Sequence, residues 1–129
     1  LRSARMARQR DRFETLVQAE LADVRILGEV SNRLPNTSSM TIAGVTGEAM
    51  VMRLDAVGIA TATGSACSSG SGKPSPVLVA MGLSDDDIQG ALRISLGWNT
   101  TDDDIEAAAA ALVRCARTLR RLAPQETHV

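Results

Sequence analysis

The stretch TDDDIEAAAAALVRCARTLRRL, residues 101–122, is the clearest helical pattern in the chain. Thr101 is suited to the N-cap position, and the three aspartates after it lie where the helix dipole favours carboxylates. Arginines gather towards the other end, where cations are favoured, and Pro124 follows as a helix stop. One apolar stripe runs along the helix, through Ile105, Ala109, Leu112, Ala116 and Leu119. Such a helix buries its stripe against another layer of structure.

Upstream of this helix, short strand-like segments alternate with helical ones. Three segments are rich in β-branched residues or bounded by Pro and Gly, and they cover residues 37–43, 59–63 and 91–96. Helical patterns cover residues 1–22, 47–57, 74–81 and 84–90. The sequence therefore predicts an α/β fold of the α+β type, a small domain in which helices pack on a three-stranded sheet.

Length and composition exclude several classes of function. The 129 residues suit one domain, and 44% of them are apolar, which is enough for a core. A net charge of -1 and 2% aromatic residues argue against nucleic-acid binding, so we interpret the arginines of residues 2–12 as a solvated or interdomain helix face. No apolar run is long enough to span a membrane. Two cysteines make no disulfide framework, which favours a reducing, cytoplasmic setting.

The run GSACSSGSG, residues 64–72, is the most informative stretch for function. It places Cys67 among glycines and serines, whereas cysteines are usually buried with apolar neighbours. A thiol on a flexible tether can collect a group at one site and deliver it at another, as a sulfur or acyl carrier requires. The alternatives are an inert loop cysteine and a phosphate-binding loop. The spacing of a phosphate-binding loop is absent, although Lys73 follows the run.

The remaining polar candidates are few. Arg93 lies between apolar neighbours in the strand 91–96, where it either faces solvent or holds a carboxylate with its planar guanidinium. Cys115 lies in the last helix and is interpreted as a packing residue. The single histidine, His128, is the second-to-last residue, so neither a Cys-His pair, a Ser-His-Asp triad nor a zinc site can be assembled, and we predict no metal site.

Several motifs, taken in order, carry a family resemblance. They are RLPNT (33–37), GEA (47–49), TGSACSSG (63–70), PSPVL (74–78), AMGLS (80–84), LRISLG (92–97) and TT (100–101). From about residue 10 to residue 122, the chain resembles the C-terminal region of cysteine desulfurases. These are pyridoxal-phosphate (PLP) enzymes of the class V aminotransferase group. The cysteine segment resembles the branch with a long mobile cysteine loop.

The resemblance implies a role for two residues. Cys67 would attack the sulfur of L-cysteine, hold it as a persulfide and pass it to an acceptor protein or an iron–sulfur scaffold, leaving L-alanine. Arg93 would anchor the carboxylate of the substrate. The same cysteine would also be placed for a transient iron–sulfur contact in some members.

The resemblance also implies what the chain lacks. The lysine that binds PLP belongs to a large domain upstream, and Lys73 does not match it, so no cofactor-binding residue is predicted in this chain. We expect residues 1–25 to be a helix that links to that domain and residues 26–129 to be the small C-terminal domain of a cytoplasmic homodimer. Alone, the chain is expected to be inactive. The alternatives are a non-catalytic persulfide-carrying or interaction module, and a related lyase or DNA-sulfur-modification homologue.

Overall fold

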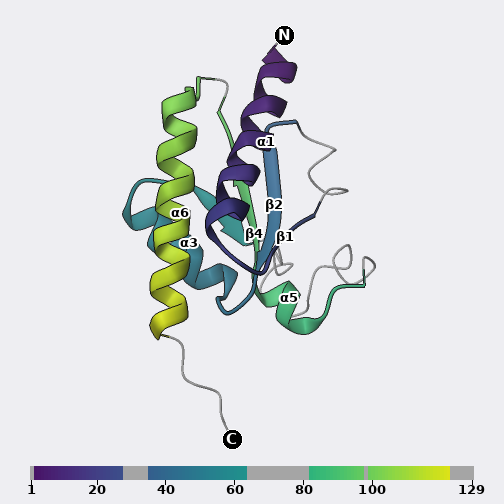
Figure 1. The fold of residues 1–129 in the computed structure, drawn as a ribbon, viewed down its shortest axis with the longest axis vertical. Coiled ribbons are helices and arrows are strands. Elements are labelled where there is room, and N and C mark those ends of the chain that lie inside the picture. The colour runs from purple at the N-terminus through teal and green to yellow at the C-terminus, as the bar shows by residue number, and fades with distance from the viewer. Residues whose placement is uncertain (1, 28–34, 64–81, 98, 123–129) are drawn as a thin grey trace, which may run out of the picture.

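The computed structural model describes residues 2–27, 35–63, 82–97 and 99–122, which form helices packed on a sheet (Figure 1). In chain order the described elements are α1 (Arg2–Glu20), β1 (Val24–Ile26), β2 (Thr37–Ile42), α3 (Gly47–Ala56), β3 (Thr61–Thr63), α5 (Asp85–Gln89), β4 (Ala91–Ser95) and α6 (Asp102–Leu122). The predicted class, helices on a small sheet, is confirmed. The predicted helix at 74–81 lies outside the described residues.

The described sheet has four strands in the order β1-β2-β4-β3, and every neighbouring pair is antiparallel. The sequence predicted three strands and missed β1. This strand is only three residues long and follows directly on a turn in which Asp23 takes a left-handed φ of 60°. Its register pairs Val24 with Ile42 and Ile26 with Met40, so β1 extends the sheet at the outer edge of β2.

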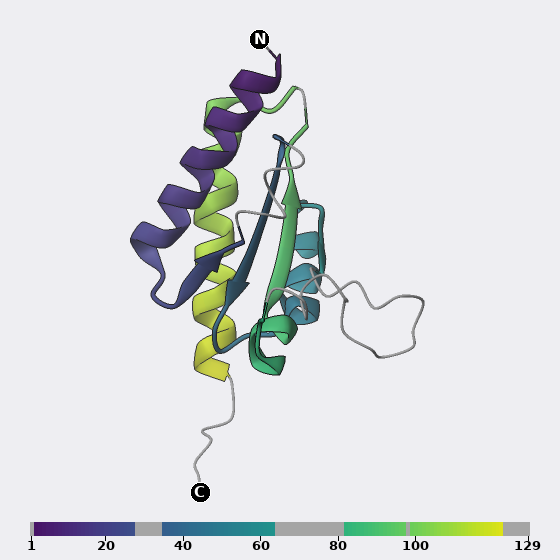
Figure 2. The same cartoon turned by 90° about the vertical axis from the view of Figure 1, so that its right-hand side faces the viewer.

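One face of the sheet, here called the front face, is covered by helices. Helices α1 and α6 lie side by side on this face (Figures 1 and 2), and α3 packs against α6 and the edge strand β3. The core between these layers includes Phe13, Met40, Met50, Leu92 and Leu112, each at most 1% exposed. The predicted stripe of α6 supplies Ile105, Ala109, Leu112 and Ala116 to this core, with Leu119 packed at its margin. Burial of this apolar surface is the main force that holds the fold together.

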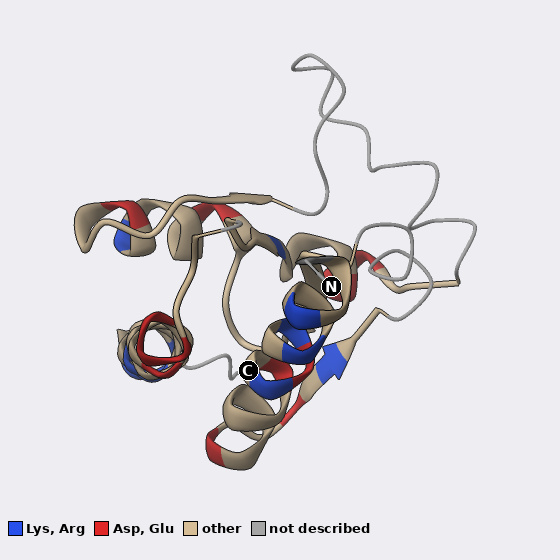
Figure 3. Cartoon of the chain, turned by 90° about the horizontal axis from the view of Figure 1, so that it is seen from above, with Lys and Arg blue, Asp and Glu red and all other residues tan. Residues whose placement is uncertain are grey.

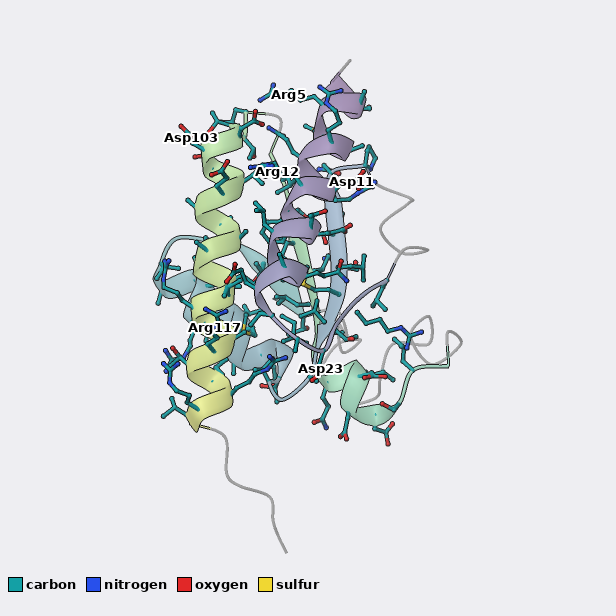
Figure 4. The ribbon with its side chains drawn as sticks, viewed as in Figure 1. Arg5, Asp11, Arg12, Asp23, Asp103 and Arg117 are labelled. Carbon is teal, nitrogen blue, oxygen red and sulfur yellow. The ribbon has the colours of Figure 1, made fainter. Side chains whose placement is uncertain are left out.

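Helices α1 and α6 run parallel, and oppositely charged side chains pair between them near both ends. Parallel helices place like ends of their dipoles together. Arginines lie along α1, as the blue segments in Figure 3 show, and Arg12 donates to Glu106 at 2.8 Å near the acidic start of α6. At the other end, Arg117 of α6 bonds Glu20 at 3.2 Å, and Figure 4 shows Arg12 and Arg117 at these two levels. Part of the arginine cluster that the sequence presents is therefore used to join two helices.

The start of α6 has the capping arrangement that its sequence predicts. The backbone N–H of Thr101 donates to Asp104 at 2.9 Å, and the N–H of Asp104 donates to the Thr101 hydroxyl at 3.1 Å. The backbone N–H and the side chain of Thr101 lower the pKa of Asp104. The N-cap prediction for Thr101 is confirmed.

A polar contact is enclosed between α1 and the sheet. The Ser38 hydroxyl, on the front face of β2, donates to Glu14 at 2.7 Å. Burial raises the pKa of Glu14 above its ordinary value, and the Ser38 hydrogen bond and the charge of Arg10 oppose this rise. The pair places a titratable group in the helix–sheet contact.

Helix α3 begins against the backbone of β4. A Cβ atom on Gly47 would lie 2.3 Å from the carbonyl oxygen of Ala91, and a Cβ on Gly90 would lie 2.6 Å from that of Ile42. Neither position has room for a side chain, so both glycines are required by close backbone approach. Gly47 belongs to one of the sequence motifs, and the contact gives it a structural reason.

Candidate functional site

The candidate site lies on the face of the sheet turned away from α1 and α6, here called the rear face. Along β4, Leu92 and Ile94 are buried in the core, while Arg93 and Ser95 are exposed. Because successive side chains of a strand point to opposite faces, Arg93 belongs to the rear face. Burial of its two neighbours fixes this orientation, since a slip of one residue would put the arginine into the core.

Arg93 has small neighbours on both sides. Its cross-strand partners are Ser39 of β2 and Ala62 of β3. Among the described residues, no hydrogen bond or ion pair involves the Arg93 guanidinium. A planar guanidinium with small neighbours and no described partner is suited to bind a carboxylate through two parallel hydrogen bonds.

Ser39 adds a second polar group beside Arg93. Its side chain is only 4% exposed, and its hydroxyl forms no hydrogen bond with any residue in the described ranges. The Ser39 hydroxyl is therefore a further polar group that a ligand at the Arg93 guanidinium could contact. No sequence pattern marks Ser39, whose place beside Arg93 is known only from the pairing of β2 with β4.

One end of the rear face is closed by apolar packing. Helix α5 contacts β2, and its Ile88 packs with Leu27, Leu83 and Ala91 in a second small cluster. The Ser84 hydroxyl accepts the Asp87 N–H at 3.1 Å and caps this helix, which lies within the helical segment 84–90 that the sequence predicts. Arg93 lies two residues beyond Ala91 on β4 and is exposed.

Of the two predicted site residues, Arg93 and Cys67, the structure describes only Arg93. Arg93 stands on the rear face, whereas Cys67 and the segment 64–72 lie outside the described residues, so their position relative to Arg93 stays a prediction. Cys115 is half-buried and packs at the margin of the main core, in keeping with its interpretation as a packing residue. His128 and Lys73 also lie outside the described ranges.

The described residues do not supply an anchor for PLP. They include no lysine, the residue type to which this cofactor is covalently attached, and Lys73 lies outside the described ranges. No group of three or more potential metal ligands occurs within the described part of the chain. No described helix has both the length and the apolarity needed to cross a bilayer.

The fold that carries the rear face and its exposed Arg93 occurs in known proteins. The aminotransferase class-V family model matches residues 3–108. A NifS-like protein from Rickettsia africae has a similar solved structure, with a TM-score of 0.72 and 25% identity over 89% of this chain and 29% of that one. The chain therefore belongs to the aminotransferase class-V family.

Within this family, the chain is similar to curated cysteine desulfurases. A cysteine desulfurase of Trichormus azollae is 39% identical over 117 residues, which are 91% of this chain and 29% of the relative. An IscS-like cysteine desulfurase of Mycobacterium tuberculosis is 41% identical over 122 residues, which are 94% of this chain and 31% of the relative. The chain thus spans about three tenths of the length of these relatives.

Proposed function

We propose that this chain supplies the sulfur-carrying thiol and the substrate-carboxylate anchor of a PLP-dependent cysteine desulfurase. The observation that carries the proposal is Arg93, which is exposed on the rear face with small neighbours and no described partner. The relatives named cysteine desulfurase, whose similarity extends over more than nine tenths of the chain, support the same reaction class. The substrate is L-cysteine, and Arg93 orients it by its carboxylate.

Cys67 performs the sulfur transfer. Its thiolate attacks the sulfur of L-cysteine, a new S–S bond forms, and the carbon–sulfur bond of the substrate breaks. The electron pair of the broken bond stays with the substrate carbon, which takes up a proton and leaves as L-alanine. The net change moves one sulfur atom from cysteine to Cys67, which becomes a persulfide. A second attack, by an acceptor thiol, returns Cys67 to the thiolate.

PLP supplies an electron sink for the carbon skeleton when bound, and the lysine that holds it belongs to the large domain of the complete enzyme. Residues 1–25 then form the link to that domain, and residues 26–129 form the small domain that carries segment 64–72. The complete enzyme is a cytoplasmic homodimer that delivers sulfur to an acceptor protein or iron–sulfur scaffold. On this proposal the isolated chain does not release alanine from cysteine.

A persulfide assay tests the carrier role on the chain itself. After exposure to a small-molecule persulfide donor and removal of excess donor, intact-mass spectrometry should show one added sulfur atom, assigned to Cys67 by peptide analysis. The Cys115→Ser variant should gain the sulfur equally, because Cys115 is half-buried among core residues. Equal gain by Cys67→Ser would remove Cys67 from the proposal.

A kinetic test addresses Arg93 in the complete enzyme. Arg93→Ala should raise KM for L-cysteine, because it removes a carboxylate contact made in the ground state. Loss of one charge-assisted pair corresponds to about 2 kcal/mol, or roughly thirtyfold in KM. An unchanged KM would contradict the anchor role.

The alternative is a persulfide-carrying module that performs no catalysis, which the lack of a lysine in the described ranges would also suit. The reading frame upstream of Leu1 separates the two. An in-frame large domain with a cofactor lysine supports the enzyme, and a start codon beside Leu1 supports the module.

A further inference from the structure

A second arginine lies on the rear face, at the edge of the sheet. Arg25 occupies the middle of β1, where it is exposed while both neighbours pack towards the main core. It pairs with Thr41 of β2, and Arg93 pairs with Ser39 of the same strand. Thr41 and Ser39 are two residues apart on β2, so Arg25 and Arg93 share one face of the sheet.

The register gives the separation of the two arginines. They lie two strand spacings apart across the sheet and two residues apart along it, so their Cα atoms are about 12 Å from each other. An extended arginine side chain covers about half of that separation. Because two such side chains together span the separation, the two guanidinium groups can both contact one small ligand that lies over β2.

Neither arginine is neutralised by a described residue. The described ion pairs join Arg10 to Asp11, Arg12 to Glu106 and Arg117 to Glu20. The aspartates of α5, the described helix on this face, form no ion pair with Arg25 or Arg93 among the described residues. Two cations on one face of the sheet repel each other, and a ligand with two negative charges relieves that repulsion.

Ser39 lies on the strand between the two arginines. Ser39 is 4% exposed and lies on β2, the strand between β1 and β4. Its cross-strand neighbour on β4 is Arg93, and on the β1 side its carbonyl accepts the Leu27 N–H at 2.8 Å. A carboxylate held by Arg93 can thus accept a further hydrogen bond from this hydroxyl.

We propose that the rear face binds a small ligand with two carboxylates, one held by Arg93 and Ser39 and the other by Arg25. This inference rests on the carboxylate-anchoring role of Arg93 in the proposed function and adds Arg25 as a second anion contact. A substrate or sulfur acceptor with a single carboxylate uses the Arg93 end alone. A small thiol acceptor with two carboxylates engages both ends.

Binding of two probes to the chain tests the proposal. Succinate carries two carboxylates and propionate carries one, and each is titrated into the folded chain at constant low ionic strength while NMR shifts are followed. Low salt is needed because exposed charges are screened within a Debye length of about 10 Å at 0.1 M. Succinate should bind about tenfold more tightly than propionate, the gain expected from one further charge-assisted contact.

Three variants assign the contacts. Arg25→Gln should weaken succinate about tenfold and leave propionate unchanged. Arg93→Gln should weaken both probes. Arg53→Gln is the matched control, since Arg53 is exposed on α3 and the described residues give it no partner. It should change neither, and circular dichroism should show that all variants keep the fold.

The outcomes separate this inference from the proposed function. If Arg25→Gln leaves succinate affinity unchanged while Arg93→Gln weakens both probes, the second contact is wrong and the carboxylate anchor stands. If Arg93→Gln leaves propionate affinity unchanged, the anchor itself is wrong. Equal affinity of the wild-type chain for the two probes, or no succinate binding, overturns the dicarboxylate site.

Discussion

Substitution of Gly47 by alanine is expected to destabilise the fold, although alanine is the better helix former. A Cβ on Gly47 would lie 2.3 Å from the Ala91 carbonyl oxygen. That is roughly 1 Å closer than two non-bonded atoms normally approach. Backbone of α3 or of β4, the strand that holds Arg93, must move to relieve the clash.

The magnitude follows from two opposing effects. Overpacking of this kind costs about 1–3 kcal/mol. Replacement of glycine by alanine stabilises the folded state by about 0.4–1 kcal/mol, because the unfolded chain loses conformational entropy. The expected net loss is therefore about 1–2 kcal/mol. The sign of the change in unfolding free energy is the informative result, because without the clash the Gly47→Ala variant would be more stable than the wild type.

Urea unfolding followed by far-ultraviolet circular dichroism measures this loss. Ala107→Gly, at an exposed position of α6, calibrates the ordinary difference between alanine and glycine in a helix, about 1 kcal/mol in favour of alanine. Gly90→Ala should be destabilising too, because its Cβ would lie 2.6 Å from the Ile42 carbonyl oxygen. Wild-type or higher stability of Gly47→Ala would refute the close approach of α3 and β4.

Three further predictions concern single side chains. Because the pKa of Glu14 is raised in the folded state, the free energy of unfolding should fall as pH rises through and above the ordinary glutamate pKa. Unfolding free energies compared at pH 4 and pH 7 should show this fall in the wild type and not in Glu14→Gln. An identical fall in both proteins would contradict the assignment. Arg120 donates to the carbonyls of Ala43 and Ala22 at 2.8 Å each, so Arg120→Ala should cost about 2 kcal/mol in urea unfolding, and a neutral result would be contrary to this reasoning. Arg12→Ala should cost less than about 1 kcal/mol, because its ion pair is exposed, and a larger loss would show that α1 depends on it.

Much of the fold could be predicted from the sequence because local signals and burial agree. The stripe and cap of α6 are found where the pattern of residues 101–122 places them. Residues 37–43 and 91–96 contain β2 and β4, whose β-branched and apolar residues lie at the centre of the sheet. Agreement of propensity with tertiary burial makes such elements predictable.

Other features depend on contacts that the sequence does not display. Strand β1 is three residues long and gains its hydrogen bonds from β2, so it is too short for sequence periodicity to predict it. The placement of Ser39 beside Arg93, and of Arg25 on the same face of the sheet, arises from pairing between strands that are distant in the chain. Arg93 itself was ambiguous from local sequence, and only the family resemblance favoured a carboxylate anchor over a solvent-facing residue.

A single-turnover experiment tests the central claim that Cys67 takes the sulfur while Arg93 holds the substrate. The proposed complete enzyme is mixed with a limiting amount of L-cysteine, and alanine and protein-bound persulfide are measured together. We predict one alanine for each persulfide, with the sulfur on Cys67 and with neither product formed by Cys67→Ser. Alanine formed at the wild-type rate by Cys67→Ser, or a persulfide located on Cys115, would contradict the account.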